Sequence, residues 1–129
     1  MENKKNLLMS YIKTNVAPIL VDFITGEDIG GAIVIPANID INELNGHYEG
    51  IEFMPPKWLK KLEDTAPNIL VIDKIDSISK NEQTKFIEIL KYKQVSTFEI
   101  PKNTVIIVTT KQINKEKINE EIYSLVAQI

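Results

Sequence analysis

Three apolar runs constrain the fold of this chain more than any other feature of its sequence. ILVDFI spans residues 19–24, ILVI spans 69–72 and TVIIVTT spans 104–110. All three are short, and the third is rich in β-branched residues, which favour strands. A strand that is apolar on both faces belongs in a parallel sheet with helices packed on either side. The sequence therefore predicts an α/β fold in three layers (αβα) around a small parallel sheet.

Helical patterns separate the three runs at lengths that allow right-handed crossovers. Residues 3–14 form the first predicted helix, and Pro55-Pro56 open a second. Ser79 and Glu82 have the spacing of a capping box, which predicts a third helix that ends near Tyr92. Asn114 is the predicted cap of a last helix near the end of the chain. The remaining expectations are a short strand at 32–36, a loop at 37–53 and a small hairpin at 95–101.

The composition is that of an ordinary globular chain. With 129 residues, 43% of them hydrophobic, the chain is expected to form one domain over residues 1–129. No apolar run approaches the roughly 20 residues that span a bilayer, and the first residues do not have the pattern of a signal peptide. The sequence contains no cysteine, so it has no disulfide or thiolate site. We therefore expect a cytoplasmic protein without a membrane partner.

The basic residues have a distinctive composition, because all 15 are lysine and none is arginine. A planar, bidentate phosphate clamp of the kind that arginine provides is therefore not available within the chain. The net charge of -3 argues against nucleic acid as a partner, because such binding depends mostly on neutralising phosphates.

Polar residues follow two of the apolar runs, at the point where ligands bind in open parallel sheets. Asp73 and Lys74 come directly after ILVI, and Thr109, Thr110 and Lys111 end or follow TVIIVTT. We therefore treat Asp73, Lys74, Thr110 and Lys111 as the candidate site residues.

The order of features along residues 5–112 resembles the middle of an AAA+ ATPase module, most closely the MoxR-type group. The features are GEDIGG, PPKWLKKL, NILVIDKID, SKNEQTKFIEILKYKQV and IPKNTVIIVTT, in that order. In that group a Pro-Pro-x-Trp helix precedes the Walker B strand. A glutamine-bearing helix, a Leu-Pro turn and the sensor 1 strand follow it. The resemblance implies a P-loop NTPase-like fold for this chain.

The resemblance assigns a family role to each candidate site residue. Asp73 corresponds to the Walker B aspartate that helps to hold Mg²⁺. Lys74 falls where the family has the glutamate that activates the attacking water, and a charged lysine cannot accept that proton. Thr110 or Lys111 falls near the polar residue of sensor 1, which is usually asparagine. The resemblance thus implies vestigial Walker B and sensor 1 positions.

Other catalytic parts of the family are missing from the sequence. When the chain is aligned on its first helix, the Walker A loop would precede that helix, and Lys4 or Lys5 falls near the P-loop lysine with no Gly-x-x-x-x-Gly before it. Such a loop cradles phosphates with its backbone N–H groups. The arginine finger, which contributes about 10³–10⁵ in rate, is absent, as is the helical lid domain. We therefore expect no ATP hydrolysis by this chain alone, no cofactor and no bound metal.

Several residues have a simpler interpretation beside the functional one. Asp73 either retains a magnesium ligand or serves a structural role, capping the next turn or pairing with lysine, and we favour the structural role. Asp76 is expected to cap the following helix and not to form a metal pair with Asp73. His47 has no neighbouring ligand residues in the sequence. GEDIGG resembles the family's loop near the central pore, and its glycines are expected to serve turns.

The missing P-loop strand carries a structural expectation. In the AAA+ sheet that strand lies beside the sensor 1 strand, so TVIIVTT would become an exposed sheet edge. A long apolar edge aggregates unless something covers it. We expect another copy, a partner chain or the terminal helices to cover this edge.

Two functions from different classes follow. The favoured one is a catalytically inactive AAA+-like module that acts through protein–protein contacts, as a self-associating scaffold or as a regulator of a true AAA+ partner. The alternative is the nucleotide-binding part of a composite ATPase whose P-loop comes from another chain. Lys74 and the lack of arginine favour the first, and Asp73 supports the second. A piece of a larger ATPase is a third interpretation.

Overall fold

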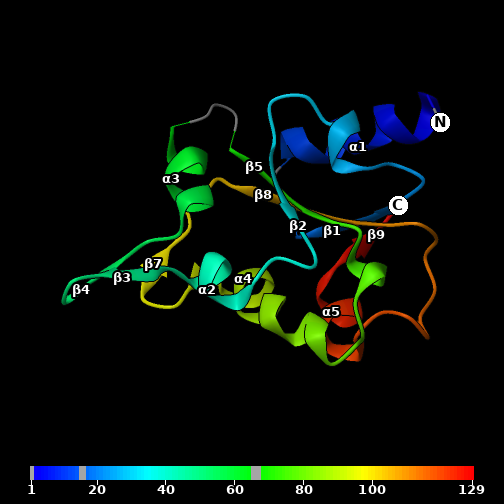
Figure 1. Cartoon of the computed structure of the whole chain (residues 1–129). Coiled ribbons are helices and arrows are strands. Elements are labelled where there is room, and N and C mark those ends of the chain that lie inside the picture. Colours follow the sequence, from blue (N-terminus) through cyan, green and yellow to red (C-terminus); the bar gives the residue numbers. More distant parts are fainter. Residues whose placement is uncertain (1, 15–16, 65–67) are drawn as a thin grey trace.

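A five-stranded sheet with every strand parallel to its neighbours forms the centre of the molecule (Figure 1). The computed structural model describes residues 2–14, 17–64 and 68–129. The sheet has the order β2-β5-β8-β1-β9. Its strands are β1 (Ile19–Asp22), β2 (Ile33–Pro36), β5 (Ile69–Asp73), β8 (Val105–Thr110) and β9 (Ala127–Gln128). The three apolar runs supply β1, β5 and β8, and the predicted strand at 32–36 is β2.

β8 lies in the middle of the sheet and not at its edge. It pairs with β5 on one side and with β1 on the other, and all six of its residues are buried. The expectation that TVIIVTT forms an exposed edge was therefore wrong. β1 takes the place beside β8 that the expectation assigned to a missing strand. The edges of the sheet are β2 and β9, which are shorter than β8.

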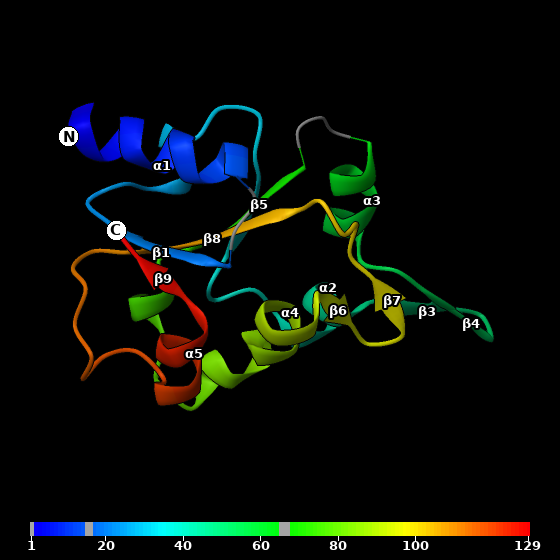
Figure 2. The same cartoon turned by 180° about the vertical axis from the view of Figure 1, so that it is seen from behind.

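Helices cover both faces of the sheet, which gives the three layers predicted from the sequence. Helix α1 (Glu2–Thr14) lies on one face, where Leu8 and Ile12 pack against alternate residues of β1, β5 and β8. The opposite face carries α4 (Ile87–Tyr92) and α5 (Glu120–Leu125), as Figure 2 shows from behind. Helix α3 (Lys57–Glu63) packs into the same core. Within the described residues, no helix combines the length and apolar character that crossing a membrane requires.

The capping box predicted at Ser79 is present, but the helix after it begins with tighter turns. Glu82 N donates to Ser79 Oγ at 3.2 Å, and Ser79 N donates to Glu82 Oε1 at 3.4 Å. A 3-10 helix, η3 (Glu82–Phe86), leads from this pair into α4.

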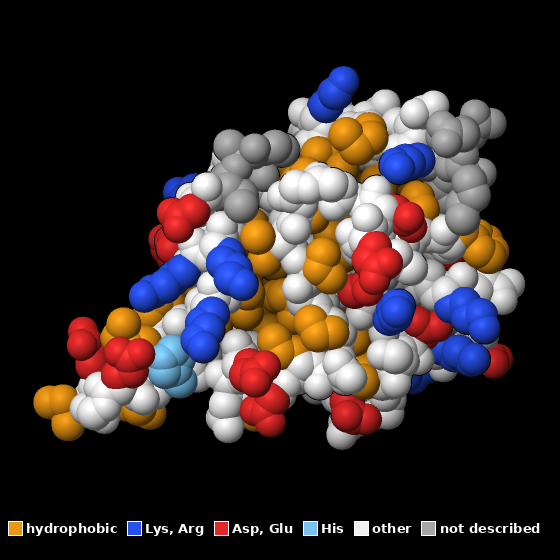
Figure 3. Space-filling model, turned by 45° about the horizontal axis from the view of Figure 1, so that its top comes forward, with side chains coloured by type: hydrophobic (Ala, Val, Ile, Leu, Met, Phe, Trp, Pro, Cys, Tyr) orange, Lys and Arg blue, Asp and Glu red, His pale blue; other side chains and the backbone are white. Residues whose placement is uncertain are grey.

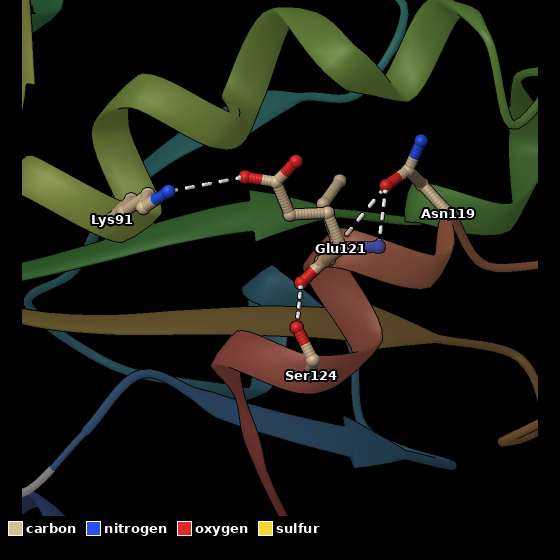
Figure 4. A network of polar contacts seen from close by, with 5 residues as sticks. Lys91, Asn119, Glu121 and Ser124 are labelled. Atoms are coloured by element: carbon tan, nitrogen blue, oxygen red, sulfur yellow. Dashed lines mark hydrogen bonds and ion pairs between the residues drawn. The ribbon is translucent and has the colours of Figure 1, made fainter.

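The last helix begins later than predicted. Asn119, and not Asn114, caps α5, since its Oδ1 accepts from Glu121 N at 2.9 Å and from Ile122 N at 3.2 Å (Figure 4). Lys91 of α4 lies 3.7 Å from Glu121, which places α5 beside α4. The chain then leaves α5 and adds β9 to the sheet, where the sequence predicted helix.

The loop predicted over 37–53 contains regular structure. A short helix, α2 (Ile41–Asn45), is capped by Asp40, whose Oδ1 accepts from Asn42 N at 2.8 Å. An antiparallel hairpin follows, made of β3 (His47–Glu49) and β4 (Glu52–Met54). Pro56 is the N-cap of α3 and not part of its first turn. The hairpin predicted at 95–101 is present as β6 (Gln94–Val95) and β7 (Phe98–Glu99).

Gln83 joins three segments on the α4–α5 side of the sheet. Its side chain is fully buried. Its Nε2 lies 3.1 Å from Ile75 O, 3.2 Å from Ile78 O and 2.9 Å from Lys117 O. Its Oε1 accepts from Asn119 N at 2.7 Å. This one amide therefore holds the turn after β5 and the start of α5 in place.

Candidate functional site

Asp73 ends β5 at the carboxyl edge of the sheet, where the sequence placed it. Its Oδ1 accepts two hydrogen bonds, from Gly26 N at 2.8 Å and from Thr109 Oγ1 at 2.7 Å. Gly26 belongs to the loop after β1, and Thr109 belongs to β8. The carboxylate therefore ties together three segments at the carboxyl edge. Its partners in these two hydrogen bonds are a backbone N–H and a hydroxyl, and not the lysine that the structural interpretation named.

Gly26 lies close to the side chain of Val34 on β2 as well as to Asp73. A Cβ at Gly26 would lie 2.7 Å from Val34 Cγ1 and 3.4 Å from the Asp73 carboxyl carbon. The first distance is shorter than real Cβ contacts. A side chain at this position would therefore have to displace Val34, so the close approach of the loop to β2 favours glycine here.

Lys74 follows in the left-handed region, with φ of 59°. Its backbone N–H donates to Thr109 Oγ1 at 2.8 Å, which continues the chain of hydrogen bonds from Asp73. The Lys74 side chain is exposed. A non-glycine residue in this region costs of the order of 1 kcal/mol, and such strain is often found at functional sites.

The residue of β8 that contacts Asp73 is not one of the two that the sequence analysis matched to sensor 1. Thr109, and not Thr110, contacts the aspartate. Thr110 Oγ1 lies 3.3 Å from Gln112 O, and Lys111 N lies 3.4 Å from both carboxylate oxygens of Asp76. Asp76 lies within the 3-10 turn η2 (Ile75–Ser77), so its predicted role as a cap of the following helix was wrong.

A cleft of about 410 Å³ opens at this edge. Three of the four candidate residues, Lys74, Thr110 and Lys111, line it, while Asp73 does not. The other lining residues are Phe23, Ile24, Thr25, Asp76, Ser77 and Thr109. Phe23, like Lys74, has a positive φ, at 62°, and its ring is exposed. The cleft thus has apolar and hydroxyl walls with two lysines.

The loop after β1 also lies at this edge, a position that the sequence analysis did not predict. GEDIGG leaves the strand that neighbours β8 and lies at the carboxyl edge, against Asp73. Gly26 and Gly31 have the Gly-x-x-x-x-Gly spacing of a phosphate loop, but Ala32 and Ile33 follow instead of Lys-Ser/Thr. The loop forms a 3-10 turn, η1 (Gly26–Asp28), and then enters β2 with no α-helix between them.

Three further residues of this site were not among the four candidates, although the sequence analysis placed Thr109 at a strand end. Gly26 and Thr109 are the partners of Asp73, and Asp22 ends β1 with only 8% of its surface exposed. Asp22 Oδ2 accepts from Ile113 N at 3.4 Å. The only available signal was the position of Asp22 and Thr109 at the end of apolar runs. Gly26 could not have been found, because its contact spans 47 residues.

Within the described ranges, no group of three His, Cys, Asp or Glu residues lies close enough to hold an ion. His47 lies on the hairpin, where its Nε2 is 3.3 Å from Glu49 Oε1. Of the two lysines compared with the P-loop lysine, Lys5 is exposed on α1, and the side chain of Lys4 lies outside the described part.

The three layers and the parallel five-stranded sheet are consistent with a P-loop NTPase-like fold. One solved structure that it resembles is NtrX from Brucella abortus, which was crystallised in complex with ATP. The TM-score is 0.58 at 15% sequence identity, over 98% of this chain. At this identity the similarity shows the fold alone.

This chain covers 34% of the NtrX chain, so it spans about a third of that protein. A scan against protein-family models finds none that matches the sequence. A search of curated proteins also finds no matching relative.

Proposed function

We propose that this chain is a catalytically inactive AAA+-like module that acts through protein–protein contacts. The observation that carries the proposal is the loop after β1, residues 23–31. It lies beside Asp73 at the carboxyl edge, where a nucleotide-binding domain of this fold places its phosphates. Its charged residues are Glu27 and Asp28, and it contains no lysine. Two acids at this position repel a triphosphate instead of attracting it.

The hydrogen bonds of the loop support the same proposal. A phosphate loop binds its ligand with free backbone N–H groups that point into the site. Here the N–H of Gly26 donates to Asp73, and that of Thr25 donates to Asp28 Oδ2 at 2.9 Å. Asp73 Oδ1 accepts two hydrogen bonds from the protein itself, which reduces what it can offer to Mg²⁺. Lys74 adds a cation where the related enzymes have a general base.

Calorimetric titration of the chain with ATP and Mg²⁺ tests the proposal. We expect no binding at millimolar nucleotide, and none for Lys74→Glu, because restoring the acid leaves the loop unchanged. Asp73→Ala is the second comparison. Micromolar binding that is lost in Asp73→Ala would contradict the proposal.

That outcome would instead favour the nucleotide-binding part of a composite ATPase, with the P-loop supplied by another chain. The retained Asp73 at the end of β5 is the observation in favour of this second function. Adding the partner chain also distinguishes the two functions, because only a composite enzyme then gains ATPase activity.

A further inference from the structure

The β3–β4 hairpin projects away from the sheet (Figure 1), and apolar side chains are exposed at its tip. Tyr48 is 71% exposed and Ile51 is fully exposed. Glu49 and Glu52 flank them, and both are exposed. A hairpin tip needs no isoleucine for its own folding, and exposed apolar side chains held together on one projection are typical of a contact surface.

Contacts at its base hold the hairpin in a defined position. The Tyr48 and Phe53 rings lie 4.9 Å apart, and Phe53 stacks with Phe98 of β7 at 5.7 Å. Gly46, just before β3, has φ of 117°, and a Cβ there would lie 2.5 Å from Met54 O. The tip is therefore presented by a packed base, which lowers the entropy lost when it binds.

A groove of about 710 Å³ lies beside the hairpin and along the edge strand β2. Its apolar residues are Ile33, Val34, Ile39, Pro56 and Trp58. Its charged rim consists of Lys57 and Lys61 on α3, with Glu43 and Glu49 across from them. In Figure 3, orange side chains lie between blue and red ones on this face, and the pale-blue His47 marks the hairpin. Among the described residues, neither lysine of the rim makes an ion pair within 4 Å.

We propose that the occupant of this groove is the hairpin tip of a second copy of the chain. The tip offers Ile51 and Tyr48 to the apolar wall, and Glu49 and Glu52 to the two rim lysines. The chain thus carries both halves of a complementary contact. This proposal deepens the proposed function and rests on it, since it names the partner of the protein–protein contact.

The positions of the two halves favour a symmetric dimer. His47 and Glu49 of the hairpin line the groove of their own chain, so hairpin and groove share one face. A two-fold axis at this face would place each hairpin in the groove of the other copy. The dimer would then contain two equivalent tip–groove contacts, and would bury twice the surface that one contact buries. Each Glu52, which lines no part of its own groove, would then face Lys57 and Lys61 across the interface.

Sedimentation velocity of the whole chain, from about 5 to about 300 μM, tests the association over a range that includes micromolar dissociation constants. We expect a monomer–dimer equilibrium in the wild type. Ile51→Asp should weaken it at least about tenfold, because it places a charge against the apolar wall. Met9→Asp is the matched control, since Met9 is 45% exposed on α1 and lines no part of the groove. A wild type that stays monomeric, or a dimer that Ile51→Asp leaves unchanged, would overturn the proposal.

A charge exchange tests the pairing directly. Lys57→Glu with Lys61→Glu makes the groove acidic, and Glu49→Lys with Glu52→Lys makes the tip basic. We expect each double variant alone to be monomeric, since its tip and groove then have the same sign of charge. An equimolar mixture should form heterodimers, because both contacts again join opposite charges. Circular dichroism checks that both variants fold. Double variants that dimerise alone, or a mixture that stays monomeric, would contradict the assigned contact.

The failures of the two proposals are distinguishable. A monomer that binds no ATP would overturn the dimer and leave the inactive module standing with a different partner. Micromolar ATP binding would overturn the proposed function, whatever the oligomeric state.

Discussion

At the scale of single residues, Asp73 and Gln83 both act by joining segments that are distant in the sequence. Asp73 accepts from Gly26 and Thr109, and Gln83 bonds backbone groups between Ile75 and Asn119. Each uses one short polar side chain to satisfy several donors or acceptors that would otherwise be buried without partners. Their removal therefore costs more than one average hydrogen bond.

For Asp73, the substitutions Ala and Asn separate geometry from charge. Asp73→Ala leaves the Gly26 N–H and the Thr109 hydroxyl without their acceptor, so we expect a loss of about 2–4 kcal/mol. Asp73→Asn keeps an oxygen acceptor and should lose only about 1 kcal/mol. Urea unfolding measures both. Equal losses for the two variants would show that the acceptor is not the important feature.

A comparison of Gln83 with Thr104 measures how much a buried polar side chain stabilises the fold when it has hydrogen-bond partners. Gln83→Leu leaves the backbone groups that bond to the buried amide without a partner, and should lower the free energy of unfolding by about 2–4 kcal/mol. In the described part of the chain, Thr104 Oγ1 is a buried oxygen without a hydrogen-bond partner. Thr104→Val should therefore be neutral or stabilise by about 1 kcal/mol. The same unfolding experiment measures both, and a clear loss in Thr104→Val would contradict this account.

At the scale of elements, the sequence predicts those helices and strands whose formation depends on the residues within them. β1, β5 and β8 are continuous apolar runs, and α1 has helical periodicity, so the class of fold and these elements were predicted correctly. The hairpin β3–β4 was missed because HYEGIEF contains charged residues and alternates weakly. β9 was missed because Ala127 and Gln128 pair with β1, which lies more than a hundred residues earlier. The position of β8 in the sheet depends on strand order, which no local pattern contains.

The candidate site also consists of residues that the sequence predicts and residues whose contacts depend on the folded sheet. Asp73, Lys74, Thr110 and Lys111 were found because they end or follow buried strands. The roles of Gly26 and Thr109 were not found, because hydrogen bonds over 47 and 36 residues depend on the folded sheet. The contact of GEDIGG with Asp73 was not predicted for the same reason, since it appears only in the folded chain.

The joint between α2 and the hairpin gives the prediction that belongs to this scale. Gly46 has φ of 117° and ψ of 178°, a region that is open essentially to glycine alone. Gly46→Ala should cost at least about 2 kcal/mol, since its Cβ would also collide with Met54 O. Gly50→Ala is the matched control, because Gly50 has φ of 66° and open space around it. We expect about 1 kcal/mol for the control, measured by thermal unfolding. Equal losses would show that the collision is relieved cheaply.

At the scale of the whole molecule, the central strand of the sheet has the most extensive pairing and packing. β8 has a partner on both sides and helices over both faces, whereas β9 has only two paired residues. Amide hydrogens exchange most slowly where opening requires global unfolding. We therefore expect the amides of Val105–Thr110 to exchange at the rate of global unfolding, and those of β9 to exchange much faster. Hydrogen exchange followed by NMR measures this order. Fast exchange in β8 would contradict the strand order.

The position of β1 between β8 and β9 also matters during protein synthesis. Both of its neighbours are translated long after it, since β8 begins at Val105. At roughly 5–20 residues per second, the ribosome takes about 4–17 s to pass from Asp22 to Val105. During that time Ile19, Leu20 and Val21 have no strand to pair with, and only α1 is available to shelter one face of them. Synonymous codon changes between β1 and β8 that slow translation are therefore expected to lower the yield of folded protein, although they alter no amino acid.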